Sequence, residues 1–176
     1  TVCTETCRSR ALAVIAPPEK PGGKFRVLEK LRFNGIDFQG QADEIHKVAE
    51  RYNVEDIAID TTGSGEAVLQ LVLKWFPTAR RINYSVAVKG ALVMKGQNVF
   101  RNRRIEFDAG WSDVQAAFMA IRPTLTGSGR QVTYTAKRNG EVGHADIAWA
   151  ILHALSNEPM DASEPVSRGA KVKFFD

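Results

Sequence analysis

Cysteine is scarce in this sequence, and both cysteines, Cys3 and Cys7, lie in the first seven residues. A disulfide-stabilised scaffold usually carries more cysteines, spread along the chain, and a zinc site would need two further ligands that the sequence does not place near by. We therefore expect two free thiols, as is usual in an intracellular protein.

Long apolar runs are also missing. No run approaches the roughly 18 residues that a membrane helix needs, and the opening residues lack a signal-peptide pattern. At 176 residues, of which 44% are hydrophobic, the chain has enough apolar material for the core of one domain. We expect a soluble cytoplasmic protein with no membrane partner, a domain over residues 1–157 and a flexible tail over 158–176, where Pro, Ser and charged residues dominate.

Acidic residues are absent from positions 80–104, although the net charge of the whole chain is only +4. This stretch contains seven basic residues: Arg80, Arg81, Lys89, Lys95, Arg101, Arg103 and Arg104. Such a stripe is typical of a surface that binds a polyanion such as DNA, and a solvated basic face is the alternative.

The periodicity of apolar residues predicts alternating strands and helices. We expect a hairpin of strands at 11–16 and 24–33, helices at 38–52, 63–76, 86–101, 112–122 and 145–155, strands at 56–60 and 81–85, and a short extended piece at 103–108. Ser112 is the expected N-cap of its helix, and the Asn139-Gly140 pair predicts a hairpin turn. This order indicates a mixed α/β layer fold.

Asp60 ends the apolar strand and is followed by Thr61, Thr62, Gly63, Ser64 and Gly65, which lead into a helix. Ligands of open α/β sheets collect at the carboxyl ends of strands. The loop residues Thr61, Gly63, Ser64 and Gly65 would let a phosphate approach the helix N-terminus, but without a Lys this is no nucleotide-binding P-loop. An Asx-turn or N-cap role for Asp60 is the simpler alternative.

Asp146 opens the last predicted helix in "GHADIAWAILHAL". The helix dipole favours an acidic residue there, but its apolar neighbours indicate a buried helix in which a carboxylate needs a metal, a proton or a partner. Two carboxylates at one end of a sheet suit hard divalent cations, and two such ions would activate water for phosphodiester cleavage. His144 would act in proton transfer or, alternatively, cap the helix.

Four stretches, in this order, resemble the C-terminal nuclease domain of the large terminase subunit of tailed bacteriophages: "IAIDTTGSGEAVLQLV", "NYSVAVKGALV", "RIEFDAGWSDVQAAFMAIRPTLTGSGRQVTYTA" and "GHADIAWAILHAL". The resemblance implies an RNase H-like mixed β-sheet flanked by helices, with a β-hairpin before the last helix. It also implies a Mg²⁺- or Mn²⁺-dependent endonuclease, with two ions, that cuts concatemeric viral DNA during packaging in the cytoplasm of a bacterial host.

The same resemblance implies roles and partners. Asp60 and Asp146 fall on metal-ligand positions. Independently of the resemblance, His144 lies two residues before Asp146, and the basic stretch supplies Lys89, Arg101, Arg103 and Arg104 as the expected DNA contacts. The implied partners are double-stranded DNA, the terminase small subunit and the portal protein, and the N-terminal ATPase domain of the family is not represented in this sequence.

The sequence departs from the family at the first strand, where the resemblance implies a third metal-binding Asp. No Asp precedes Asp37, and Glu5 is the only acid near the expected position at Val2. Three explanations are open: Glu5 takes the place of the missing Asp, the sequence is a decayed prophage copy, or the residues at this end are altered or truncated. The alternatives to the terminase nuclease are therefore a catalytically impaired DNA-binding or docking module of the same fold and a nuclease similar to junction resolvases.

Overall fold

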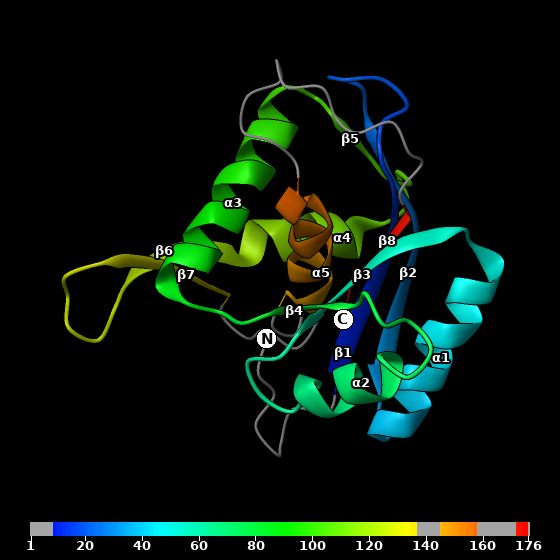
Figure 1. Ribbon diagram of the computed structural model, residues 1–176. Coiled ribbons are helices and arrows are strands. Elements are labelled where there is room, and N and C mark those ends of the chain that lie inside the picture. Colours follow the sequence, from blue (N-terminus) through cyan, green and yellow to red (C-terminus); the bar gives the residue numbers. More distant parts are fainter. Residues whose placement is uncertain (1–8, 137–144, 158–171, 176) are drawn as a thin grey trace.

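A six-stranded mixed sheet, with helices on both faces, forms the body of the protein (Figure 1). The computed structural model describes residues 9–136, 145–157 and 172–175. The strands are β1 (Ser9–Ala16), β2 (Phe25–Asn34), β3 (Val54–Asp60), β4 (Arg80–Ile82), β5 (Ile105–Glu106) and β8 (Val172–Phe175), in the order β4-β3-β8-β1-β2-β5. No helix in the described part of the chain is long and apolar enough to cross a bilayer.

Five α-helices and a separate hairpin complete the described fold. The helices are α1 (Phe38–Arg51), α2 (Gly65–Val72), α3 (Val86–Arg101), α4 (Ser112–Ala120) and α5 (Asp146–Ala154), and a 3-10 turn, Leu155–Asn157, follows α5. Strands β6 (Ile121–Leu125) and β7 (Val132–Ala136) pair with each other in antiparallel register, away from the main sheet. This hairpin projects from the body of the molecule in Figure 1.

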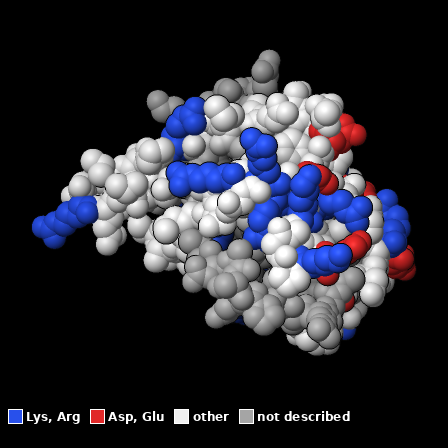
Figure 2. Space-filling view, turned by 90° about the horizontal axis from the view of Figure 1, so that it is seen from above, with Lys and Arg blue, Asp and Glu red and all other residues white. Residues whose placement is uncertain are grey.

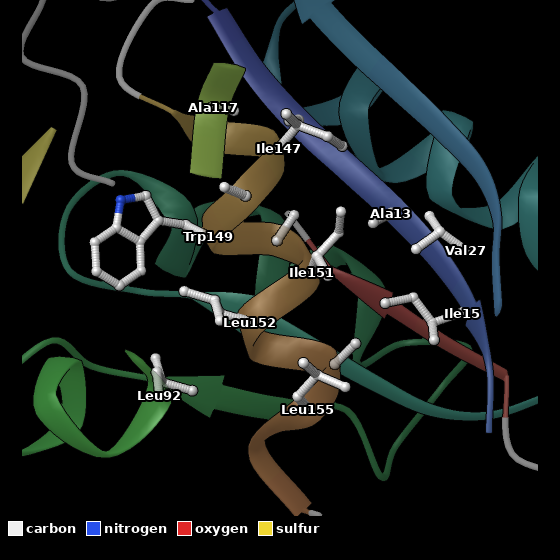
Figure 3. Packing of buried hydrophobic residues seen from close by; sticks show 14 of the residues in the cluster. Ala13, Ile15, Val27, Leu92, Ala117, Ile147, Trp149, Ile151, Leu152 and Leu155 are labelled. Atoms are coloured by element: carbon white, nitrogen blue, oxygen red, sulfur yellow. The ribbon is translucent and has the colours of Figure 1, made fainter. Parts of the chain in front are cut away.

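The alternation of side chains along β1 and β3 divides the core between the two faces of the sheet. Leu12 and Val14 face the cluster formed with α1 and α2, whereas Ala13 and Ile15 face the cluster that contains α5. Helix α5 is apolar nearly all round because the sheet, α3 and α4 surround it, and residues 147–154 are all buried (Figure 3).

The predicted α/β fold and the opening antiparallel hairpin are confirmed, as β1 and β2 pair from Ser9 with Asn34 to Ala16 with Arg26. The parallel pairing of β3 with β4 is also found. Helices α1, α2, α4 and α5 are shorter than predicted. Helix α2 ends at Val72, where the chain turns through i to i−3 bonds such as Trp75 N–H to Val72 O at 3.1 Å.

The region around Ile121 was predicted wrongly. Helix α4 ends at Ala120, and Ile121 begins β6, because Pro123 excludes the preceding residue from helical backbone. Ser112 is not the N-cap: Trp111 occupies that position without a side-chain cap bond. The hairpin before α5 is β6–β7, and the turn predicted at Asn139-Gly140 lies outside the described residues.

Strand β8 differs from the prediction of a tail. The backbone of Val172–Phe175 lies between β1 and β3, antiparallel to the first and parallel to the second. A four-residue strand without an apolar pattern around it gives little signal in the sequence. Strand β8 is defined only by its backbone pairing with β1 and β3.

Candidate functional site

Asp60 is the last residue of β3 and is 8% exposed. Ala58 faces the α5 side of the sheet, and because strand side chains alternate, Asp60 points to the same side. One carboxylate oxygen, Oδ1, accepts a hydrogen bond of 2.8 Å from the Thr62 N–H. This is the predicted Asx-turn geometry, and it helps to fix the direction of the carboxylate.

The loop after Asp60 is held close to the strand by short-range contacts. The Thr61 N–H donates to the Ile82 carbonyl at 2.9 Å, and the Tyr84 N–H donates to the Thr62 hydroxyl at 2.8 Å. Gly65 is required here, since a Cβ at this position would lie 1.8 Å from the Asp60 carbonyl oxygen. The loop and β4 therefore move together with Asp60.

Ser64 occupies the N-cap position of α2, but its side chain makes no cap bond there. Its hydroxyl instead accepts from the guanidinium of Arg10, which also donates to Gln41 Oε1 at 2.8 Å and lies 5.5 Å from the centre of the Phe38 ring. Gly63 is exposed. Sequence reasoning missed Arg10, because only the fold brings the start of β1 to this loop.

Asp146 is the first residue of α5 and is half-buried. The preceding residue, Ala145, is fully buried and adopts left-handed backbone with φ 60° and ψ 30°, which is unfavourable for a residue with a Cβ. The packed core around α5 holds this conformation, so the carboxylate leaves the helix start in a fixed direction. His144 lies outside the described residues.

Tyr84 joins the two carboxylates electrostatically. Burial raises the pKa of its hydroxyl well above the usual value, and the negative charges of Asp60 and Asp146 raise it further. Both carboxylates therefore act on the same hydroxyl, although 86 residues separate them in the sequence. The charges of Asp60 and Asp146 thus both raise the pKa of the Tyr84 hydroxyl, and the meeting of the two carboxylates at one end of the sheet stays a prediction.

His153 supports Tyr84 from inside the core. Its Nε2 and the Tyr84 hydroxyl are 2.7 Å apart, and the residue is fully buried on α5. Burial lowers the pKa of His153 to about 3, so the imidazole is neutral at ordinary pH. Sequence reasoning assigned no role to this histidine, and its position seven residues after Asp146, two helical turns along the same face, was the available signal.

The basic residues of positions 80–104 differ in their surroundings. Arg80 pairs with Asp56 at 2.7 Å, Arg81 with Glu66 at 3.4 Å, and Lys95 donates to the Ser156 carbonyl. Lys89 is half-buried in the first turn of α3, where burial lowers the pKa of its ammonium and the charge of Asp60 opposes that shift. Several basic side chains of this stretch are therefore engaged in contacts within the protein.

Arg101 and Arg103 are exposed at the other end of α3, about 18 Å from Lys89 at 1.5 Å per helical residue. Figure 2 views this end of the molecule, where basic side chains outnumber acidic ones. Arg104 requires a correction. It is 6% exposed, its Nε donates to the Gly23 carbonyl at 3.0 Å, and its guanidinium lies 5.6 Å from the Phe25 ring centre. We therefore remove Arg104 from the predicted DNA contacts.

The donor set suits a hard divalent cation, because Asp60 and Asp146 offer carboxylate oxygens at one end of the sheet. Within the described residues, no group of three or more His, Cys, Asp or Glu side chains is placed to hold a metal ion. Two carboxylates would leave much of the coordination shell to water and to phosphate oxygens. Glu5, considered as a third ligand, lies outside the part of the chain that the structure describes.

Comparisons with known proteins identify the family of the chain. The family model described as the terminase RNaseH-like domain matches residues 9–158. The terminase ATPase subunit of Escherichia phage P2 is 49% identical over 154 residues, which is 88% of this chain and 26% of that protein. The probable terminase ATPase subunit of Haemophilus phage HP1 is 32% identical over 151 residues, 85% of this chain and 25% of that protein. The chain thus spans about a quarter of the length of these relatives.

Solved structures share the fold at low sequence identity. The large terminase nuclease from thermophilic phage G20c with bound magnesium superimposes with a TM-score of 0.66 at 19% identity, covering 83% of this chain and 74% of that one. The nuclease domain of the Thermus phage P74-26 large terminase gives a TM-score of 0.61 at 15% identity, covering 92% and 85%.

Proposed function

Because the chain belongs to the family of terminase RNaseH-like domains, we propose that it is a divalent-metal-dependent endonuclease that cuts double-stranded viral DNA during packaging. The predicted RNase H-like fold is confirmed by its likeness to large terminase nucleases. The observation that carries the proposal is the match of residues 9–158 to the terminase RNaseH-like domain, in which Asp60 ends β3 and Asp146 opens α5.

Asp60 and Asp146 are the residues that would hold Mg²⁺ or Mn²⁺, as two ions. When bound, such ions lower the pKa of water and stabilise the leaving oxygen of a phosphodiester. The chain's own residues set the geometry: the Thr62 N–H orients Asp60, and the left-handed backbone of Ala145 directs Asp146. The hydroxyl of Tyr84, whose pKa the charges of both carboxylates raise, lies 2.7 Å from His153 Nε2.

The loop of Thr61, Gly63, Ser64 and Gly65 lies next to Asp60 and offers backbone N–H groups at the start of α2, which suits a DNA phosphate. In the complete subunit we propose that this domain acts with an ATPase domain, the terminase small subunit and the portal protein, in the cytoplasm of the bacterial host.

Plasmid nicking tests the proposal directly. The chain is incubated with supercoiled DNA and Mn²⁺, beside Asp60→Asn and Asp146→Asn, which remove the charge and keep the side-chain size. We expect nicking by the unaltered chain and its loss in both variants. Full nicking by Asp60→Asn would refute the assignment of the metal ligand.

A catalytically impaired DNA-binding module is the second candidate function. It is favoured by one observation: the sequence has no Asp before residue 37, where the resemblance implies a third metal ligand. Val2→Asp separates the two candidates. Nicking that appears only in Val2→Asp would identify an impaired nuclease, whereas nicking by the unaltered chain would show that this departure is tolerated.

A further inference from the structure

Lys89 occupies an unusual position for a surface cation. It lies in the first turn of α3, whose N-cap Ser85 accepts a 3.1 Å hydrogen bond from the Val88 N–H. The Lys89 ammonium is 4.9 Å from the ring centre of Tyr84 and 5.7 Å from that of Trp149. These two rings are themselves 5.4 Å apart at 56°. A cation over two ring faces is attracted by both and loses much of its freedom of movement.

The two rings bring Lys89 into the carboxylate site. Tyr84 is the residue on which both Asp60 and Asp146 act, and the Asp60 charge acts on Lys89 as well. Burial lowers the pKa of the Lys89 ammonium, and the charge of Asp60 opposes that shift. The ammonium is therefore partly removed from water, in a region where electrostatic interactions are stronger than at the surface.

The Lys89 ammonium differs from the neighbouring basic groups in its partners. Arg80 and Arg81, in contrast, have the acidic partners Asp56 and Glu66. Lys89 makes no ion pair with any residue in the described part of the chain. A restrained, partly desolvated cation beside a carboxylate that would hold metal ions fits an anion that arrives with the substrate.

We propose that Lys89 is a catalytic residue whose ammonium contacts a non-bridging oxygen of the scissile phosphate, held there by the rings of Tyr84 and Trp149. This role rests on the proposed nuclease function and differs from that of a residue tracking the DNA backbone. Lys89 stays protonated throughout. Water attacks phosphorus and gives up one proton to solvent, the bond between phosphorus and the 3′ oxygen breaks, and that oxygen takes up a proton from solvent to leave as a hydroxyl. The ammonium stabilises the negative charge that accumulates on the phosphoryl oxygens.

The proposal predicts two effects of opposite sign in Lys89→Gln. Without DNA, the ammonium repels a divalent ion at Asp60, so its removal should tighten Mn²⁺ binding roughly threefold to tenfold. With saturating DNA, loss of the phosphate contact should slow single-turnover cleavage roughly 10- to 100-fold. A side chain that only packs against the rings would give slower cleavage without tighter Mn²⁺ binding.

The experiment measures Mn²⁺ affinity by calorimetry and cleavage of a short duplex under single-turnover conditions. Lys89→Arg keeps the charge and the ring contact, and Lys89→Met keeps the stem over the rings if Lys89→Gln unfolds. Lys74→Gln is the matched control, because Lys74 is an exposed lysine outside the site and its loss removes the same charge. We expect both effects in Lys89→Gln and neither in Lys74→Gln.

Two outcomes overturn the inference while leaving the nuclease intact: an unchanged cleavage rate in Lys89→Gln, or unchanged Mn²⁺ affinity. A chain that neither binds Mn²⁺ nor cleaves DNA refutes the nuclease proposal itself, and the role of Lys89 falls with it. The Mn²⁺ titration of the unaltered chain therefore distinguishes the two failures.

Discussion

Gly65→Ala is the substitution whose effect the structure determines most sharply. Gly65 is the buried first residue of α2, and a Cβ there would meet the Asp60 carbonyl oxygen at 1.8 Å and its carbon at 3.0 Å. Both are backbone atoms, so no side-chain rotation relieves the contact. The two segments must separate by at least about 1.2 Å to reach 3.0 Å, a distance below which real Cβ atoms are essentially never found.

The size of the effect follows from two opposing contributions. Alanine is favoured over glycine in a helix by about 1 kcal/mol, whereas overpacking of a close contact typically costs about 1–3 kcal/mol, and the atoms here are far closer than in an ordinary tight contact. We expect a net loss of about 2 kcal/mol in the free energy of unfolding, which lowers Tm by roughly 4–8 °C in a chain of this size.

Cleavage should fall further than stability. The atoms that must move belong to Asp60, and a misplacement of about 1 Å at a catalytic centre costs on the order of 100-fold in rate. The assays are urea denaturation and single-turnover cleavage at a temperature where the variant is folded.

Gly90→Ala is the matched control for this prediction. Gly90 lies inside α3, and a Cβ there would have no atom within 4 Å. We expect it to raise the free energy of unfolding by up to about 1 kcal/mol. If Gly65→Ala kept both its Tm and its cleavage rate, the close approach of α2 to Asp60 would be wrong.

Three further predictions concern other parts of the molecule. Burial lowers the pKa of His153 from 6.5 to about 3, so between these two pH values the unfolded state binds a proton and the folded state does not. The free energy of unfolding therefore falls by about 1.4 kcal/mol per pH unit below 6.5. Denaturation at pH 7 and pH 5 should show this component in the unaltered chain and not in His153→Gln. Ending the chain at Asn157 removes Val172–Phe175 from the sheet and should lower Tm, and an unchanged Tm would contradict that pairing. Arg101→Gln combined with Arg103→Gln should reduce the slope of log DNA affinity against log salt by about two, measured by fluorescence anisotropy; an unchanged slope would exclude this end of α3 from the DNA surface.

Much of the fold was predictable because its signals are local. The apolar periods of β1, β2, α1, β3, α3 and α5 are long enough to identify each element, and all six are bounded within two residues of prediction. The errors fall where tertiary pairing overrides a local pattern. Ile121 continues the apolar face of a helix, yet it begins a strand that pairs with β7, and β8 exists only through its two neighbours.

The candidate site divides in the same way. Asp60 and Asp146 were found from their places at a strand end and a helix start, while Tyr84, His153 and Arg10 were not assigned to it. Their contacts join residues 69 apart, in the case of Tyr84 and His153, and 54 apart, in the case of Arg10 and Ser64. No local pattern reports a contact over such separations.

The sequence by itself determined the order of strands and helices, the apolar faces that form the core, and the two carboxylates with their turn chemistry, because each depends on residues close together in the chain. Only the tertiary structure decided which charges remain available. The basic stretch that looked uniform in the sequence became a buried Arg104, a paired Arg80, an exposed Arg101 and a Lys89 held between aromatic rings. A charge acquires its function from the dielectric and the partners around it, and folding alone sets both.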